Sequence, residues 1–145
     1  MIRATIDVNV LLSAILGPLG ISRRIVLAWE ASWFMPIVSE GILRELDEKL
    51  RLPDILRRFH ITDADRAWIF GLLAAYGETV PLTPPDVYAV TGDPEDDAVL
   101  ATARMGGAEY LVTGDKGLLA LGEHEGVRIV TPRAFLEALE ASRSD

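Results

Sequence analysis

The sequence contains no cysteine, and this absence excludes several kinds of site. The chain has no disulfide, no thiolate nucleophile, and no zinc or iron–sulfur centre held by cysteine. Histidine is scarce as well, with only His60 and His124. Neither histidine lies in a segment that offers an acid–base partner, so we expect both at the surface and not in catalysis by a histidine pair.

Long hydrophobic runs are also missing. No apolar run approaches the ~20 residues that a membrane-spanning helix needs. The N-terminus lacks the basic, apolar and small-residue order of a secretory signal, because Asp7 interrupts it. Half of the 145 residues are apolar, which is enough to bury one full core. We therefore expect a soluble cytoplasmic protein, with a single domain over residues 1–145 and no membrane contact.

Positive charge is in the minority, with 14 basic against 22 acidic residues and a net charge of −8. Proteins that bind nucleic acid by charge alone are usually basic, so this balance counts against a simple nucleic-acid binder. It does not count against an enzyme whose carboxylates gather around metal ions, because the cations then meet the phosphate. The excess of acidic residues is also compatible with an acidic surface exposed to solvent, or with a basic protein partner.

Two other sets of residues leave a structural and a functional interpretation open. Five arginines can line a rim that holds a nucleic-acid backbone, or can lie on solvated helix faces: Arg23, Arg24, Arg51, Arg57 and Arg58. Three tryptophans can stack on bases, but their apolar neighbours favour packing in the core or at a dimer interface: Trp29, Trp33 and Trp68.

Short apolar strand patterns alternate with helical patterns along the chain. Strands are predicted at residues 2–6, 34–38, 79–82, 109–112 and 127–130. Helices are predicted at residues 9–16, 22–29, 39–50, 63–76 and 98–105 and after Pro132, with a loop over residues 82–97. This alternation predicts an α/β fold, an α/β/α sandwich around a mostly parallel central sheet.

Aspartates follow two of these strands at matching places. Asp7 comes directly after residues 2–6, and Asp115 follows the stretch "EYLVTG". In open α/β sheets, ligands bind in the crevice beyond the carboxyl ends of the strands. If the two strands are neighbours, both carboxylates reach that crevice, and a divalent cation between them makes their approach tolerable. Such oxygen sites suit Mg²⁺ or Mn²⁺, and phosphodiester hydrolysis is a natural use of them.

Further acidic residues lie where they can join this pair. The stretch "DPEDDAVLATA" offers Asp93, Glu95, Asp96 and Asp97 just before and within the first turn of the helix at 98–105. Acidic residues there also stabilise a helix N-terminus, so capping is the competing interpretation. Glu45 lies at the edge of the apolar face of its helix, where a glutamate is usually solvated.

These stretches resemble a known family. "TIDVNVLLSAI", "SEGILREL" and "DPEDDAVLATARMGGAEYLVTGDKGLL" are similar to the PIN domain, and more narrowly to the VapC-like toxins of toxin–antitoxin pairs. The resemblance covers essentially the whole chain. It implies a parallel sheet flanked by helices and an endoribonuclease that depends on Mg²⁺ or Mn²⁺ and cleaves RNA. It also implies a cognate antitoxin partner that places a basic residue in the acidic site, and a homodimer.

The resemblance also implies a set of site residues. The catalytic, metal-binding acids of the family fall on Asp7, Glu45, Asp97 and Asp115. The supporting positions fall on Asn9, on Thr113, whose hydroxyl would orient a carboxylate or the attacking water, and on Asp96 and Asp93, either of which supports Asp97 or exchanges roles with it.

Two other functions remain as alternatives. A receiver-like phosphoacceptor domain also gathers acids and a lysine at strand ends, but it needs two adjacent acids where this chain has Asp7 and Val8. A haloacid-dehalogenase-type phosphatase needs an acid where Asn9 stands. A catalytically inactive PIN scaffold that binds protein or RNA partners is the second alternative.

Overall fold

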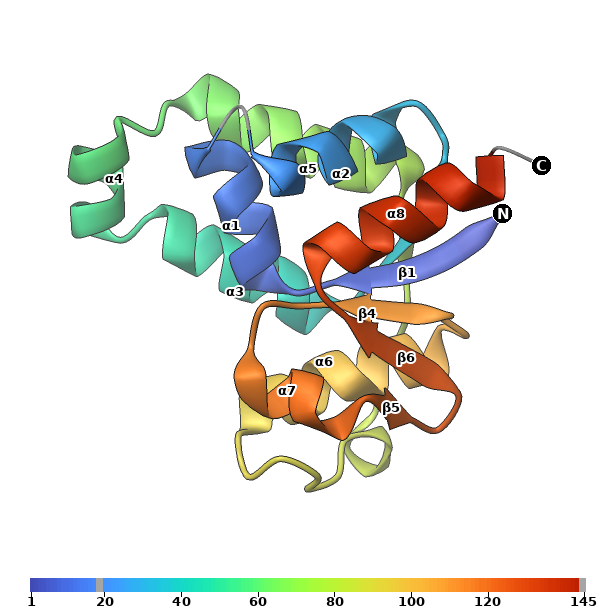
Figure 1. Ribbon diagram of the computed structural model, residues 1–145. Helices are drawn as coiled ribbons and strands as arrows, with labels where there is room; N and C mark the ends of the chain where they lie inside the picture. Colours follow the sequence, from blue (N-terminus) through green and yellow to red (C-terminus); the bar gives the residue numbers. More distant parts are fainter. Residues whose placement is uncertain (18–19, 144–145) are drawn as a thin grey trace.

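The computed structural model describes residues 1–17 and 20–143, and a six-stranded sheet lies at its centre (Figure 1). All neighbouring strands are parallel except the last pair, which is antiparallel. This confirms the predicted mostly parallel sheet. In their order across the sheet, the strands are β3 (Glu78–Thr79), β2 (Phe34–Val38), β1 (Ile2–Ile6), β4 (Tyr110–Val112), β6 (Val127–Val130) and β5 (Glu123–His124).

Helices cover both faces of the sheet. Figure 1 shows α1, α2, α5 and α8 on one side of the strands and α6 and α7 on the other. Within the described ranges no single helix is long and apolar enough to cross a membrane, and only the bent pair α1–α2 reaches that length and hydropathy jointly. The helices are α1 (Val8–Leu16), α2 (Ile21–Glu30), α3 (Glu40–Leu50), α4 (Pro53–Phe59), α5 (Asp63–Tyr76), α6 (Pro94–Met105), α7 (Lys116–Leu121) and α8 (Pro132–Arg143), with a 3-10 turn at Pro84–Asp86.

Apolar side chains from both layers pack against the sheet. Trp29 of α2 is fully buried, and its indole Nε1 donates a hydrogen bond to the backbone oxygen of Leu72 at 3.3 Å. Phe34 of β2 meets Phe135 of α8 edge to face, with ring centroids 5.0 Å apart. The core position expected for Trp29 is thus confirmed, and this ring is not available to stack on a base.

The predicted boundaries differ from the observed ones in the middle of the chain. β3 covers Glu78–Thr79 instead of residues 79–82, because Pro81 has no N–H to continue the ladder after Val80 donates to Val38 at 2.7 Å. α6 begins at Pro94 instead of residue 98, and Asp93 caps it by accepting from the backbone of Glu95 at 2.9 Å. The predicted loop over 82–97 is therefore too long.

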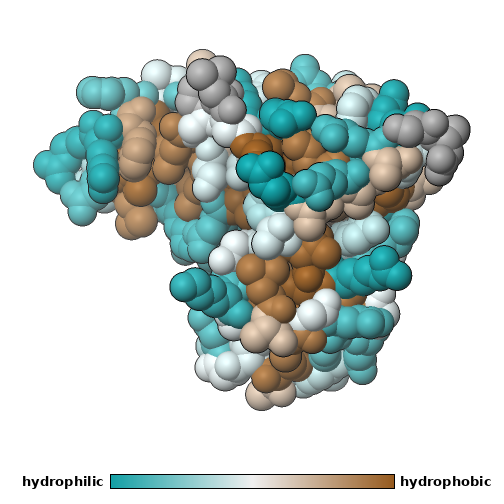
Figure 2. Space-filling model, in the orientation of Figure 1, coloured by the Kyte–Doolittle hydropathy of each residue, from teal (hydrophilic) through white to brown (hydrophobic). Residues whose placement is uncertain are grey.

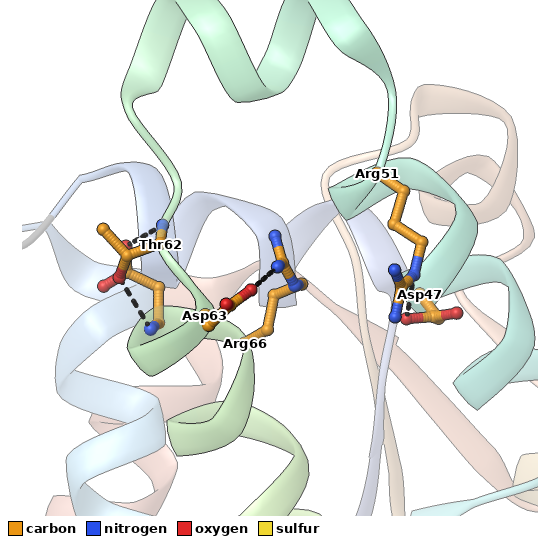
Figure 3. A network of polar contacts seen from close by, with 6 residues as sticks. Asp47, Arg51, Thr62, Asp63 and Arg66 are labelled. Atoms are coloured by element: carbon orange, nitrogen blue, oxygen red, sulfur yellow. Dashed lines mark hydrogen bonds and ion pairs between the residues drawn. The ribbon is translucent and has the colours of Figure 1, made fainter.

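α5 and α4 begin with different local signals. Thr62 and Asp65 form a reciprocal capping box at the start of α5, and Asp63 pairs with Arg66 in its first turn (Figure 3). α4 begins at Pro53, which occupies its first helical position, and it buries none of its side chains. It forms the arm that projects from the body in Figure 2, and the side chains of Leu52 and Phe59 are exposed on it.

Gly106, which ends α6, provides a test of the packing between α6 and the sheet. A Cβ atom at this position would collide with Ile37 and would lie 2.8 Å from the side chain of Val80. Overpacking of this kind costs about 1–3 kcal/mol, so we expect Gly106→Ala to lower the melting temperature by about 5 °C in a thermal denaturation experiment.

Gly71→Ala is the matched control, because Gly71 lies within α5 and a Cβ there would meet nothing within 4 Å. Alanine is the better helix former, so this variant should be more stable than the wild type by about 0.5–1 kcal/mol. Equal melting temperatures for the two variants would contradict the packing described for α6.

Candidate functional site

The site lies where β1 and β4 end side by side. The two strands are parallel neighbours, with Ile6 opposite Val112, and the backbone N–H of Asp7 donates to the oxygen of Val112 at 2.9 Å. The hydroxyl of Thr113 donates to Asp7 Oδ2 at 2.7 Å and accepts from the backbone N–H of Asp115 at 3.0 Å. Thr113 therefore connects the two aspartates that the sequence placed after separate strands.

Asp7 is a buried carboxyl group, only 7% exposed. It stands at the N-cap position of α1, yet its side chain makes no capping hydrogen bond there, so helix capping does not account for its carboxylate. Burial raises the pKa of Asp7, and repulsion from Glu45 adds to the rise. The hydrogen bond from Thr113, an interaction with the backbone of Val8 and the attraction of Lys49 oppose this increase without cancelling it.

Asp115 has a local structural role and also faces a hollow. Its Oδ2 accepts from the backbone N–H of Leu118 at 2.8 Å and caps α7, as the capping interpretation expects. The hollow beside it has a volume of about 530 Å³, within the range of ligand sites. Its lining residues are Asn9, Val10, Ser13, Ser22, Gly114, Asp115, Lys116 and Pro132.

Asp97 and Asp96 are neighbours on α6 but have different surroundings. Asp97 is buried, and its Oδ1 accepts three hydrogen bonds from the loop before α6: from the backbones of Val90 at 3.0 Å and Thr91 at 2.9 Å, and from the Thr91 hydroxyl at 3.0 Å. The bonds from Thr91 and Val90 lower the pKa of Asp97 and outweigh the effect of burial. Asp97 thus holds a loop with one carboxylate oxygen.

Asp96, in contrast, faces the other acids. Burial raises its pKa to about 6, and repulsion from Asp93, Asp115 and Asp7 contributes to the rise, with a smaller contribution from Asp97. Asp96 is therefore the α6 residue whose charge is coupled to both strand-end aspartates.

Glu45 reaches the same region from α3, and its partner there is a lysine. Lys49 Nζ lies 2.9 Å from Glu45 Oε1 and 3.2 Å from Asn9 Oδ1. Burial lowers the pKa of Lys49, but the hydrogen bond and charge of Glu45 outweigh it, so the net shift is upward. Repulsion from Glu45 and a hydrogen bond shared with it raise the pKa of Glu95. We name Asp7, Glu45, Glu95, Asp96 and Asp115 the acid cluster.

Sequence reasoning did not name Lys49, and it offered Glu95 only as one of several acids before and within the first turn of its helix. The signal for Lys49 was readable, since a glutamate and a lysine four residues apart on a helix face each other. Glu95 could not be singled out from the neighbouring acids, because the direction of its side chain depends on where α6 begins.

The other candidate residues lie elsewhere or have partners within the chain. His60 ends α4, and His124 lies in β5 beside the ring of Tyr88. The five arginines proposed as a rim all have contacts within the chain: Arg23 stacks on Trp68 at 3.9 Å, Arg24 pairs with Glu140, Arg51 with Asp47 and Arg57 with Asp54, and Arg58 lies over Phe59.

The acid cluster supplies the oxygen ligands that hard divalent cations prefer. Within residues 1–17 and 20–143, no three acidic or histidine side chains converge closely enough to coordinate one ion directly. Mg²⁺ keeps several of its waters and needs only one or two carboxylates, so this spacing fits an ion held partly through water. Asp7, whose pKa is raised by burial, is one of the groups that such a cation would stabilise.

The fold is a mostly parallel open α/β sheet with acids gathered beyond the carboxyl ends of neighbouring strands, where folds of this class bind their ligands. Within this class, residues 3–117 match the family model described as PIN domain, and the chain therefore belongs to the PIN domain family, a family of nucleases that typically use Mg²⁺. The chain is also similar to an uncharacterised protein of Methanocaldococcus jannaschii, with 27% identity over 96% of this chain and 92% of the relative.

The charge of Asp96 should appear in the pH dependence of stability. Its folded-state pKa of about 6 lies above the ordinary value of 3.8, so the folded protein binds a proton that the unfolded chain releases, and stability falls as the pH rises through this window. Asp96→Asn removes this loss. In EDTA we expect the variant to melt about 2 °C higher than the wild type at pH 7, with the difference gone near pH 4.

Asp54→Asn serves as the control, because it removes the same charge from α4, where the Asp54 side chain is 93% exposed. A pH-independent difference for Asp96→Asn, or an equal gain in the control, would show that the acid cluster does not strain the folded state.

Proposed function

We propose that this PIN domain is a Mg²⁺- or Mn²⁺-dependent endoribonuclease that cleaves RNA phosphodiester bonds, and that it is the toxin of a toxin–antitoxin pair. The observation that carries the proposal is the buried carboxylate of Asp7, held by Thr113 next to Asp115 at the ends of two adjacent parallel strands. A buried carboxylate that does not cap its helix costs stability, and binding a cation is a use that accounts for this cost.

The residues of the acid cluster have different roles in this proposal. Asp7, Asp96 and Asp115 would hold the ion directly or through water, and Glu45 would complete the negative field from α3. When bound, the divalent ion supplies the positive charge that activates a water and stabilises the departing oxygen of the RNA. Asp97, which the family resemblance places among the ligands, would act by fixing the loop beside Asp96.

Two residues would orient the others. The Thr113 hydroxyl fixes Oδ2 of Asp7 and the backbone of Asp115 at once, so both carboxylates keep one geometry. Asn9 extends toward the same place from the first turn of α1, where its Oδ1 meets Lys49. The hollow of about 530 Å³ beside Asp115 gives the RNA strand room next to the acids, with Lys116 on its wall to meet a phosphate.

The cellular part of the proposal concerns partners. An acidic protein with a net charge of −8 suits an antitoxin that presents a basic residue to the acid cluster, and the same proposal includes a homodimer. Expression that arrests growth, relieved by the product of a small neighbouring gene, would support this role. RNA cleavage at full rate without any effect on growth would support the nuclease activity and contradict the role as a toxin.

Asp7→Asn and Asp115→Asn test the mechanism. Each change keeps the size of the side chain but removes a negative charge from the acid cluster, and the amide oxygen introduced by Asp7→Asn can still accept the hydrogen bond from Thr113. We expect each variant to fold and to cleave labelled RNA about 100-fold more slowly than the wild type in Mg²⁺ or Mn²⁺. Cleavage is measured over a metal titration, with melting temperatures as the check on folding.

Asp47→Asn is the matched control, because Asp47 is an exposed acid of α3 that pairs with Arg51 outside the acid cluster. Undiminished metal-dependent cleavage by both test variants would reject the mechanism. A folded wild type that cleaves no RNA and binds no Mn²⁺ would favour the inactive scaffold, and a stable aspartyl adduct with acetyl phosphate would favour the phosphoacceptor.

A further inference from the structure

Lys49 brings a fixed positive charge into the acid cluster. It lies on α3 one turn after Glu45, and its ammonium group bridges Glu45 Oε1 at 2.9 Å and Asn9 Oδ1 at 3.2 Å. The Lys49 side chain is 30% exposed and that of Glu45 only 17%, so solvent screens their contact less than it screens a surface ion pair. The ammonium thus links the helix that follows β1 to the helix that follows β2.

The charge of Lys49 also acts beyond its two direct contacts. It is attracted by Glu95 and by Asp7 as well as by Glu45. A carboxylate from α3 and an amide oxygen from α1 therefore contact the Lys49 ammonium, and the charge of a second carboxylate, Glu95 on α6, also attracts it. These hard oxygen groups are also the ligands that a Mg²⁺ or Mn²⁺ ion would accept.

The other side of the acid cluster has a different charge balance. Burial and repulsion from Asp93, Asp115 and Asp7 are the largest influences that raise the pKa of Asp96. Lys49 contacts Glu45 directly at 2.9 Å, whereas its attraction is the smallest influence on the pKa of Asp7. The larger uncompensated negative charge therefore lies on the side of Asp7, Asp96 and Asp115.

We propose that Lys49 takes the place of a second metal ion, so that the protein holds a single divalent ion on the Asp7–Asp96–Asp115 side and an ammonium group on the Glu45 side. This inference rests on the proposed metal-dependent function and deepens it, because it assigns the number of ions that the site takes. An ammonium and a divalent ion compete for the same oxygen atoms and repel each other at short range. While the Lys49 ammonium stays on the Glu45 side, it therefore prevents a second divalent ion from binding there.

Counting bound Mn²⁺ ions tests the proposal without any activity measurement. Mn²⁺ is titrated into the purified protein at roughly 0.1 M salt, where weak surface binding is screened, and the free ion is followed by electron paramagnetic resonance. The wild type should bind one Mn²⁺ per chain. Lys49→Gln should bind a second ion, because Glu45, Glu95 and Asn9 are then left without their cation. Lys49→Arg, which keeps the charge, should bind one.

Arg51→Gln is the matched control. Arg51 and Asp47 form an ion pair on the same helix with the same four-residue spacing, at 3.0 Å, but in an exposed position (Figure 3). The variant loses the same charge as Lys49→Gln and should still bind one Mn²⁺. A second ion in this variant would mean that net charge alone governs the count, which would overturn the proposal.

The remaining outcomes separate this inference from the proposed function. A wild type that binds two ions, or a Lys49→Gln variant that binds one with wild-type affinity, would overturn the role of Lys49 and leave the metal site intact. If neither the wild type nor Asp7→Asn binds Mn²⁺, both the role of Lys49 and the proposed metal-dependent function are overturned. The wild-type count decides the question even if Lys49→Gln fails to fold.

Discussion

The parallel pairing of β1 with β4 is the constraint on which the candidate site depends. Asp7 and Thr113 follow residues that lie opposite each other in this pair, so the ladder that holds the sheet also sets their spacing. The Thr113 hydroxyl then uses both of its hydrogen-bonding functions, donating to Asp7 and accepting from the backbone of Asp115. A site built in this way cannot drift without loss of a buried hydrogen bond, which typically costs about 1–3 kcal/mol.

The sequence predicted the fold well because its strongest signals are local. Apolar strand patterns and capping residues predicted the parallel sheet and most helices, whereas the strand order, the short strand β5 and the bounds of β3 were not readable. β5 has only two residues and its place depends on pairing with β6, and β3 ends because Pro81 follows it. These features come from tertiary contacts, which periodicity does not report.

The candidate site was predictable to the extent that it lies at strand ends. Asp7 and Asp115 were singled out by their positions after strands, and the structure gives both a place at the same edge of the sheet. The acids of α6 were harder to assign, because one step along a helix turns a side chain by about 100°. With the helix starting at Pro94, Asp96 faces the other acids and Asp97 turns to the loop at Thr91.

A buried carboxylate can be tolerated in three ways, by a proton, by hydrogen bonds or by a cation, and Asp7 shows a part of each. Burial raises its pKa, Thr113 donates to it, and Lys49 attracts it from α3. None of the three cancels the cost fully, because the net shift remains upward. In the proposed function, a bound cation would supply the stabilisation of the Asp7 carboxylate that Thr113 and Lys49 leave incomplete. The affinity of such a site is set by the compensation already present as much as by the acids themselves.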